Sequence, residues 1–332
     1  MREFFVKRWF LIALVVVLTI GFTQASNLQF LANETVGKWV RRSIVASVLF
    51  MMAFPLTFTA FTTGLRRPGP AILASAVNFG ILPLFSWAVY FCLLPFLNHD
   101  LAIGLLVAAA TPSTLASAAV WTRRAGGNDS VAIMVTIFTN LGCFLITPLW
   151  LLTMTGTQVE SLELTAMIVK LLLLVVLPMT FAQLLRLQPT IGAWSAKNKQ
   201  SLGVGAQTGV LAMILLGSVN AGLRIQGEAE TSGASMVDFT IMIAAVLGIH
   251  IAMLWVGHVL ARAFRMARQD RIAVGFSGSQ KTLMVGLAIA IEDYGKSHPL
   301  AVLPMVTYHV GQLLVDTFVA DRLRKSVKNE PD

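Results

Sequence analysis

One short segment of this sequence places a cationic side chain among small and hydroxyl residues, within otherwise apolar surroundings. It reads FSGSQKTLMVG, from Phe276 to Gly286, and its lysine is Lys281. An ammonium group can carry a proton, bind an anion or stand among oxygen ligands in place of a metal cation. A second segment, TPSTLASAAV from Thr111 to Val120, also replaces bulky apolar residues with hydroxyl ones. The chemistry of both segments depends on whether water, protein or lipid surrounds them.

The composition indicates a membrane protein that crosses the bilayer several times. Of the 332 residues, 56% are hydrophobic and only 12% are charged, about half the charged share of a soluble domain. A bilayer core of roughly 30 Å requires about 20 apolar residues in a helix. Ten segments meet this requirement, at 9–26, 43–64, 70–97, 101–122, 129–153, 163–187, 203–222, 236–264, 271–292 and 299–320. The first is predicted to be a retained helix, and a cleavable signal peptide is the alternative.

The distribution of basic residues predicts which side of the membrane each loop faces. With ten spans, 18 of the 25 Lys and Arg residues fall on one side and 5 on the other, and Lys170 and Lys281 lie within spans. The side with fewer cations holds Lys38, Arg41, Arg42, Arg224 and Lys296. Because basic residues collect in cytoplasmic loops, both termini are predicted to be cytoplasmic, in a bacterial-type inner membrane. The net charge of +9 then needs no nucleic-acid partner. The expected partners are the lipid bilayer and a small solute, and a homo-oligomer is left open.

The chain divides into two halves with matching interruptions. The fourth and ninth predicted spans carry the two polar segments, which start 165 residues apart, at 111 and 276. Helix breaks at membrane depth occur only where protein or a water-filled cavity satisfies the backbone. Paired interruptions in two inverted halves are typical of the binding site of a secondary transporter. We expect 1–190 to hold the first five-helix repeat plus helix 6, and 191–332 to hold helices 7–10.

Two stretches, 110–150 and 275–325, resemble the bile acid:sodium symporter family. The first reads ATPSTLASAAVWTRRAGGNDSVAIMVTIFTNLGCFLITPLW, and the second contains GFSGSQKTLMVGLAIA and PMVTYHVGQLLVDTFVADRLRK. The GSQK and YHVGQ details resemble most the SBF-like branch of cation:proton antiporter-like transporters. The resemblance implies an all-α integral membrane fold of ten transmembrane helices in two inverted five-helix repeats. It also implies a panel domain of helices 1, 2, 6 and 7 and a core domain of helices 3–5 and 8–10. Broken helices 4 and 9 would cross in the core, which moves against the panel.

The resemblance also assigns site residues, position by position. The family's polar positions in helices 3, 4, 5 and 9 are matched by Asn78, Ser117, Thr136 and Gln280. Positions that usually carry an acid, two amides and a hydroxyl are instead Phe276, Ala118, Lys281 and Ala132. A sodium site needs several hard oxygen ligands, so these replacements argue against sodium coupling. The coupling ion stays open between Na⁺ and H⁺, and neither a cofactor nor a bound metal is expected.

Lys281 lies about ten residues into the ninth span, which is roughly 15 Å along a helix and close to mid-bilayer. A charge there costs about 3 kcal/mol on insertion and is by default functional. In one interpretation the ammonium replaces sodium among Ser117, Thr136, Asn78 and helix-end carbonyls. In others it carries a proton, or binds an anion beside the positive ends of half-helices. The alternative without a function is a side chain that snorkels to the interface.

Further polar residues complete the candidate site. They are Thr114, Ser113, Ser279 and His309. These side chains could line the substrate path or relay protons, or they could only satisfy broken backbone and pack between helices. Asp316 is expected to be an interfacial or paired acid near the cytoplasmic end, with a coupling role as the alternative. Lys170 is expected to snorkel near the outer face, and His250 is expected to be structural.

The sequence therefore predicts a secondary active transporter of a small organic solute, and the positive charges near the crossing favour an organic anion. The alternatives within transport are a sodium-coupled bile-acid-type symporter and a proton or cation antiporter that uses Lys281 with His309 or Asp316. An intramembrane enzyme is disfavoured, because the sequence has no DDxxD, HExxH or GxSxG motif. A non-transporting membrane partner is disfavoured because broken helices need a cavity to line.

Overall fold

The protein is an all-helical membrane protein in the part of the chain that the computed structural model describes, residues 2–32, 34–56, 68–156, 163–227 and 234–328. Within these ranges, seven helical stretches are long and apolar enough to cross a membrane. They are Gly69–Leu93, Asp129–Thr155, Leu164–Arg186, Lys199–Leu223, Met236–Ala263, Arg268–Glu292 and Pro299–Lys325. Trp9–Thr23 and His99–Ala110 are shorter apolar helices. The chain therefore crosses the membrane several times, and the count of ten spans stays a prediction.

The helices follow one another along the chain with short connections. The first half contains α1 (Arg2–Thr23), η1 (Gln29–Ala32), α2 (Glu34–Ala53), α4 (Gly69–Ala76), the π-helical η2 (Val77–Ile81), α5 (Leu82–Leu93), α6 (His99–Ala110), α7 (Ser117–Arg124) and α8 (Asp129–Thr155). The second half contains α9 (Leu164–Leu171), the π-helical η3 (Leu172–Val176), α10 (Leu177–Arg186), α11 (Pro189–Lys197), α12 (Lys199–Gly227), α13 (Met236–Ala263), α14 (Arg268–Ser279), α15 (Leu283–Glu292), η4 (Pro299–Ala301) and α16 (Val302–Lys328).

Two of the predicted spans are interrupted at membrane depth. The fourth consists of α6 and α7, which are separated at 111–116 around Pro112, a residue that has no backbone N–H to donate. The ninth consists of α14 and α15, where Gln280 and Thr282 have extended backbones, with ψ of 145° and 126°. The most apolar stretch of the ninth span is completely buried inside the protein. The second interruption is thus enclosed by other helices and does not face lipid.

The helices pack in two groups around the α14–α15 segment. One group, α4, α7, α8 and α13, packs against α14. In the other, α1 and α2 lie along α12, and α10 packs against α2. The α15 helix contacts α16 and α6 as well as α12 and α2, so it lies where the groups meet. The division of these helices into two inverted repeats stays a prediction.

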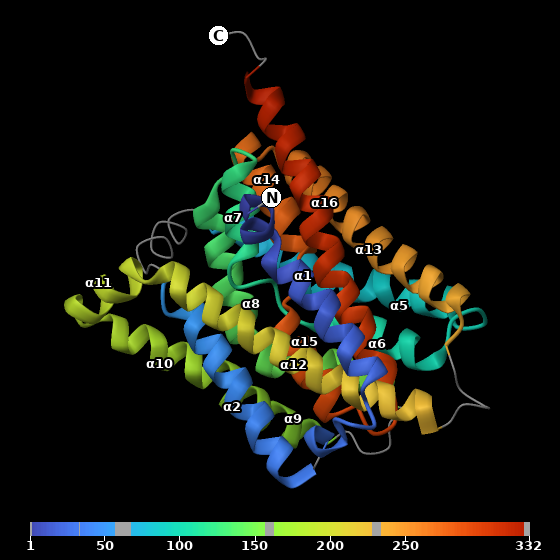
Figure 1. Ribbon diagram of the computed structural model, residues 1–332. Coiled ribbons are helices and arrows are strands. Elements are labelled where there is room, and N and C mark those ends of the chain that lie inside the picture. Colours follow the sequence, from blue (N-terminus) through green and yellow to red (C-terminus); the bar gives the residue numbers. More distant parts are fainter. Residues whose placement is uncertain (1, 33, 57–67, 157–162, 228–233, 329–332) are drawn as a thin grey trace.

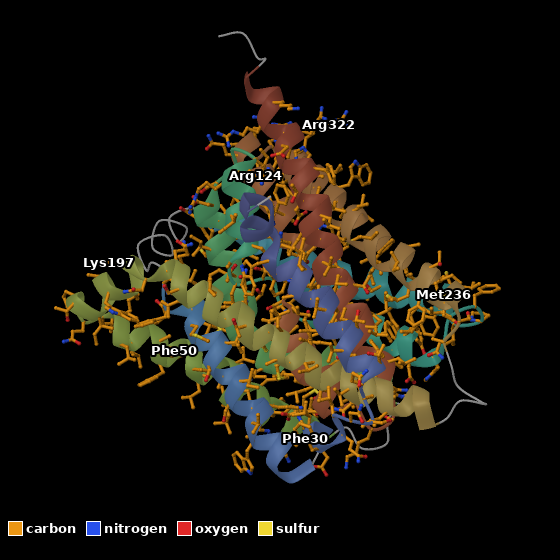
Figure 2. The ribbon with its side chains drawn as sticks, viewed as in Figure 1. Phe30, Phe50, Arg124, Lys197, Met236 and Arg322 are labelled. Carbon is orange, nitrogen blue, oxygen red and sulfur yellow. The ribbon has the colours of Figure 1, made fainter. Side chains whose placement is uncertain are left out.

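The N-terminal end of α1 and the C-terminal end of α16 lie toward the same end of the molecule, at the top of Figure 1. Basic side chains gather there, and Arg124 and Arg322 are labelled in that region of Figure 2. Arg124 on α7 donates to Asp321 on α16 with an Nε–Oδ1 distance of 2.7 Å. This is the end that the charge distribution predicts to be cytoplasmic.

Candidate functional site

The two interruptions bond directly to each other at the centre of the molecule. The Thr282 N–H donates to the Pro112 carbonyl at 2.9 Å. The Ser113 hydroxyl donates to the Ser277 carbonyl at 3.0 Å. Each break therefore supplies partners for backbone groups that the other has lost from its helix, which membrane depth requires.

Hydroxyl and amide side chains of α8 satisfy the rest of the first break. The bonds run from Thr147 Oγ1 to Ala110 O at 2.8 Å, from Thr136 Oγ1 to Thr114 O at 2.8 Å, from Asn140 Nδ2 to Ser113 O at 2.9 Å, and from Ser113 N to Thr139 Oγ1 at 3.2 Å. Thr136 and Asn140 lie four residues apart, so they share one face of α8. Thr136, a predicted site residue, thus holds the broken backbone in place.

The Lys281 side chain is completely buried and its ammonium lies among oxygen atoms. Nζ donates to the Thr111 carbonyl at 2.7 Å, to the Asn78 carbonyl at 2.8 Å and to Asn78 Oδ1 at 3.3 Å. The ring of Phe79 lies on another side, with its centroid 5.8 Å from Nζ. The ammonium therefore lies in the protein interior and does not reach an interface.

The carbonyls around Lys281 are free because the local helix geometry removes their usual donors. In an α-helix the Asn78 carbonyl would accept from Leu82 N–H, but the π-helical turn directs that group to Val77 O. The next residue, Pro83, has no N–H to offer. The Thr111 carbonyl belongs to the C-cap of α6, where the helix dipole is negative. Both carbonyl oxygens therefore have a lone pair available to accept a hydrogen bond from the ammonium.

The backbone of Lys281 is fixed by Gln312 on α16. Lys281 N–H donates to Gln312 Oε1 at 2.9 Å, and Gln312 Nε2 donates to Lys281 O at 3.0 Å. His309, one turn earlier, has its Nδ1 3.0 Å from Gln312 Nε2. His309, a predicted site residue, therefore lies beside Gln312 and the Lys281 backbone, while the ammonium bonds to Asn78 and Thr111.

The side chain of Gln280 connects the two breaks to α16. Its Oε1 accepts from Thr114 Oγ1 at 2.6 Å and from Ser117 Oγ at 2.9 Å. Its Nε2 donates to the Asp316 carboxylate. Ser117, expected near the Lys281 ammonium, is thus bonded to Gln280 instead, whereas Asn78 is a ligand of the ammonium as expected.

A buried acid–histidine pair lies beside this network. Asp316 Oδ1 is 2.9 Å from His250 Nε2, and the side chains are 0% and 1% exposed. The other ring nitrogen of His250 faces the carbonyl of Ser279 at 3.3 Å, and Tyr308 donates to that same carbonyl at 2.8 Å. Asp316 is therefore paired, as one interpretation of the sequence had it, but lies in the interior and not at the interface. His250, expected to be only structural, contacts the candidate site.

A pattern in the sequence could have indicated part of this arrangement. His309, Gln312 and Asp316 are spaced by three and four residues, which places polar side chains on one face of a helix. Asp316 belongs to this face, although its distance from the cytoplasmic end of the predicted span suggested a different role from the others. No comparable pattern marks His250, because its contacts come from other helices.

Comparison with known proteins shows which family the chain belongs to. The model of the SBF-like CPA transporter family matches residues 8–325. The chain belongs to this family. It is similar to an uncharacterized protein of Pseudomonas aeruginosa, with 28% identity over 87% of this chain and 86% of the relative. It is also similar to sodium/bile acid cotransporter 7 of Rattus norvegicus, with 22% identity over 96% and 93% of the two chains. Sodium/bile acid cotransporter 7 of Danio rerio is 23% identical, over 96% and 94%.

The side chains that replace expected sodium ligands in this SBF-like transporter offer no oxygen. Phe276 is 1% exposed and packs in an apolar cluster with Ala125, Ile272 and Ala320. Ala118 is completely buried. The oxygens of Asn78 and Thr111 instead receive the Lys281 ammonium. The oxygens around this position are therefore occupied by a cation that the protein itself supplies.

Proposed function

We propose that this protein is a secondary active transporter that moves a small organic anion by alternating access. Membership of a transporter family supports transport, and the polar network at the two interruptions supports a site there. We propose ten spans in two inverted repeats, with 1–190 carrying helices 1–6 and 191–332 carrying helices 7–10. The panel is then α1, α2, α9–α10 and α12, and the core is α4–α8 and α13–α16. The proposed setting is an inner membrane, with both termini cytoplasmic.

One observation carries this proposal: the Lys281 ammonium has three oxygen partners within 3.3 Å at the crossing of the breaks. An ammonium has three N–H donors, which match the three acceptors. Lysine is a compact point charge, as a sodium ion is. We propose that Lys281 supplies permanently the positive charge that relatives with sodium in their name would take from the solution.

The direction of the helix dipoles supports an anion as the transported solute. Both α7 and α15 begin at the crossing, at Ser117 and Leu283. The N-terminal end of a helix carries a partial positive charge, and in transporters such half-helix ends face anionic groups of the substrate. Together with Lys281, these ends make the centre of the protein favourable for a carboxylate.

The test is uptake of radiolabelled citrate into liposomes that contain the purified protein. We expect uptake to persist when all sodium is replaced by potassium. We expect the Lys281→Asn variant, which restores an amide usual in the family, to lose this sodium-independent uptake. Uptake that strictly follows a sodium gradient in the wild type, or normal uptake by Lys281→Ala, would contradict the proposed role of the lysine.

A second candidate function is proton-coupled exchange, favoured by the buried His250–Asp316 pair bonded to Gln280. A histidine and a carboxylate at a transport site can take up and release protons. The same liposomes, loaded with a pH-sensitive dye, test this function. Internal pH that changes with solute addition in the wild type, but not in Asp316→Asn, is the expected result. An unchanged response in that variant would exclude Asp316 as the carrier.

A further inference from the structure

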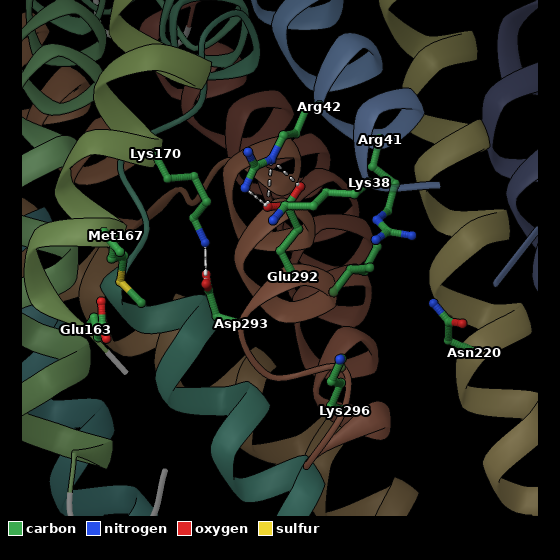
Figure 3. A pocket seen from close by; sticks show the side chains of 13 residues that line it. Lys38, Arg41, Arg42, Glu163, Met167, Lys170, Asn220, Glu292, Asp293 and Lys296 are labelled. Carbon is green, nitrogen blue, oxygen red and sulfur yellow. Dashed lines mark hydrogen bonds and ion pairs between the residues drawn. The ribbon is translucent and has the colours of Figure 1, made fainter. Parts of the chain in front are cut away.

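A cavity of about 460 Å³ lies between α2, α9, α12 and the end of α15 (Figure 3). Five cationic side chains line it, namely Lys38, Arg41, Arg42, Lys170 and Lys296. Its acidic side chains are Glu163, Glu292 and Asp293. The volume is in the range of small-molecule binding sites. The helices around the cavity meet toward the end of the molecule opposite the C-terminal end of α16 (Figure 1).

These cations are exceptions to the charge distribution of the rest of the chain. Four of the five Lys and Arg residues on the predicted outer side line this one cavity: Lys38, Arg41, Arg42 and Lys296. Basic residues are disfavoured in short outer loops. Lys38, Arg41 and Arg42 on α2 nevertheless lie at the same cavity as Lys296, which follows α15. Their convergence indicates a site for negative charge.

Two of the cations are already neutralised by carboxylates. Arg42 on α2 pairs with Glu292 at the end of α15, with an Nη2–Oε2 distance of 3.2 Å. Lys170 on α9 pairs with Asp293, the next residue. These ion pairs connect two helices of the proposed panel to one helix of the proposed core (Figure 3). The two ion pairs therefore join the proposed panel to the proposed core, whose contacts must change if the core moves during transport.

The other cations leave the cavity positive. In total the lining holds five cations against three carboxylates, so its net charge is positive. The Arg41 Nε is buried and, among the residues that the structure describes, has no hydrogen-bond partner. A buried polar group without a partner is unfavourable, and a guanidinium is suited to bind a carboxylate through two parallel bonds. Arg41 therefore has bonding capacity that a ligand can use.

We propose that this cavity is the outer docking site for a small polycarboxylate, with Arg41 and Lys38 as its principal ligands. This inference rests on the proposed transport of an organic anion and names its chemical class. Several cations in one cavity match more than one carboxylate on the same molecule. A bound carboxylate also competes with Glu292 for Arg42, because both accept from the same guanidinium. Binding thereby weakens the connection between α2 and α15.

Calorimetric titration of citrate into the purified full-length protein in lipid nanodiscs tests the docking site. We expect Arg41→Gln to weaken citrate binding at least tenfold, because a charge-assisted pair is lost. Glu292→Gln should strengthen binding, because the competing carboxylate is gone. Lys197→Gln, at the end of α11, is the matched control and should bind as the wild type does. Sulfate in place of citrate should bind at least tenfold more weakly than citrate.

The outcomes separate this inference from the proposed function. Equal citrate affinity in the wild type and Arg41→Gln, with both eluting as folded protein in size-exclusion chromatography, would overturn the docking site. Equal binding of sulfate and citrate would overturn the polycarboxylate as the ligand class. Citrate binding that needs Arg41, without citrate uptake into liposomes, would support the site and count against the transport function.

Discussion

Lys281 and the cations of the cavity between α2, α9, α12 and α15 carry the same charge in opposite surroundings. The Lys281 ammonium bonds to three oxygens of its own protein and is completely buried. In the cavity, Arg42 and Lys170 pair with carboxylates, while the buried Arg41 Nε has no partner among the described residues. A cation whose donors are all occupied acts as part of the scaffold. A cation with open donors, or with a partner that can be replaced, can bind a ligand and release it.

Among the substitutions that test this comparison, Lys281→Ala is expected to lower the free energy of unfolding most. Removing the side chain leaves buried carbonyls without a donor and a cavity in the core, which together cost about 3–5 kcal/mol. Thermal unfolding in detergent, followed by tryptophan fluorescence, measures the loss.

Sodium provides the control for this variant. If the ammonium substitutes for a cation, added sodium chloride should partly restore the stability of Lys281→Ala, and potassium chloride should do so less, because potassium is larger. Wild-type stability should respond to both salts alike. A variant as stable as the wild type in plain buffer would show that the lysine is not part of the scaffold.

The next largest loss of stability is expected from Asp316→Ala. This substitution leaves Gln280 and His250 without their buried partner, which costs about 1–3 kcal/mol. Asp316→Asn keeps an acceptor oxygen and should cost less. Unfolding temperatures of the two variants give the order, and the reverse order would contradict the hydrogen-bond assignment.

A smaller effect is expected at the cavity from Arg42→Gln. The Arg42 side chain is 29% exposed, and partly exposed ion pairs contribute roughly 1 kcal/mol or less. The unfolding temperature should therefore change little, while added salt should lower the stability of the wild type slightly more than that of the variant. A loss as large as that in Lys281→Ala would erase the distinction between the two regions.

The smallest expected effect is a pH dependence of stability that comes from Asp293, the residue after the end of α15. Burial raises the pKa of this carboxyl more than the neighbouring Lys170 lowers it. The native state then binds its proton at a higher pH than the unfolded chain does. Stability from this group should fall as pH rises from the ordinary aspartate pKa through the raised one. Asp293→Asn should remove that slope in unfolding titrations, and an unchanged slope would assign it to another group.

The sequence predicted the parts of this protein that depend on positions within one helix. The interruptions near Pro112 and Lys281 could be found because hydroxyl and small residues replace apolar ones there. The rise per residue predicts a position of Lys281 close to mid-bilayer, and that depth stays a prediction. Membership of the symporter-related family was confirmed by the match over residues 8–325.

The parts that depend on contacts between helices were not predictable in the same way. The distance of Lys170 from the span end indicated a snorkelling side chain, but Asp293 lies beside it, 123 residues later in the chain. The pairing of His250 with Asp316 also joins two helices, whose rotation about their axes a single sequence does not determine. The same holds for the cavity, which four separate helices form.

The turn at Asn78 has a consequence for how the membrane voltage acts on this protein. The oxygens that hold the Lys281 charge come from η2 and the end of α6, both assigned to the proposed core. When the core moves, the charge is expected to move with it, without breaking its hydrogen bonds. A full elementary charge crossing the membrane field changes the free energy by about 2.3 kcal/mol per 100 mV. Voltage steps on membranes containing the protein should thus elicit a transient current without added solute, and Lys281→Ala should abolish it.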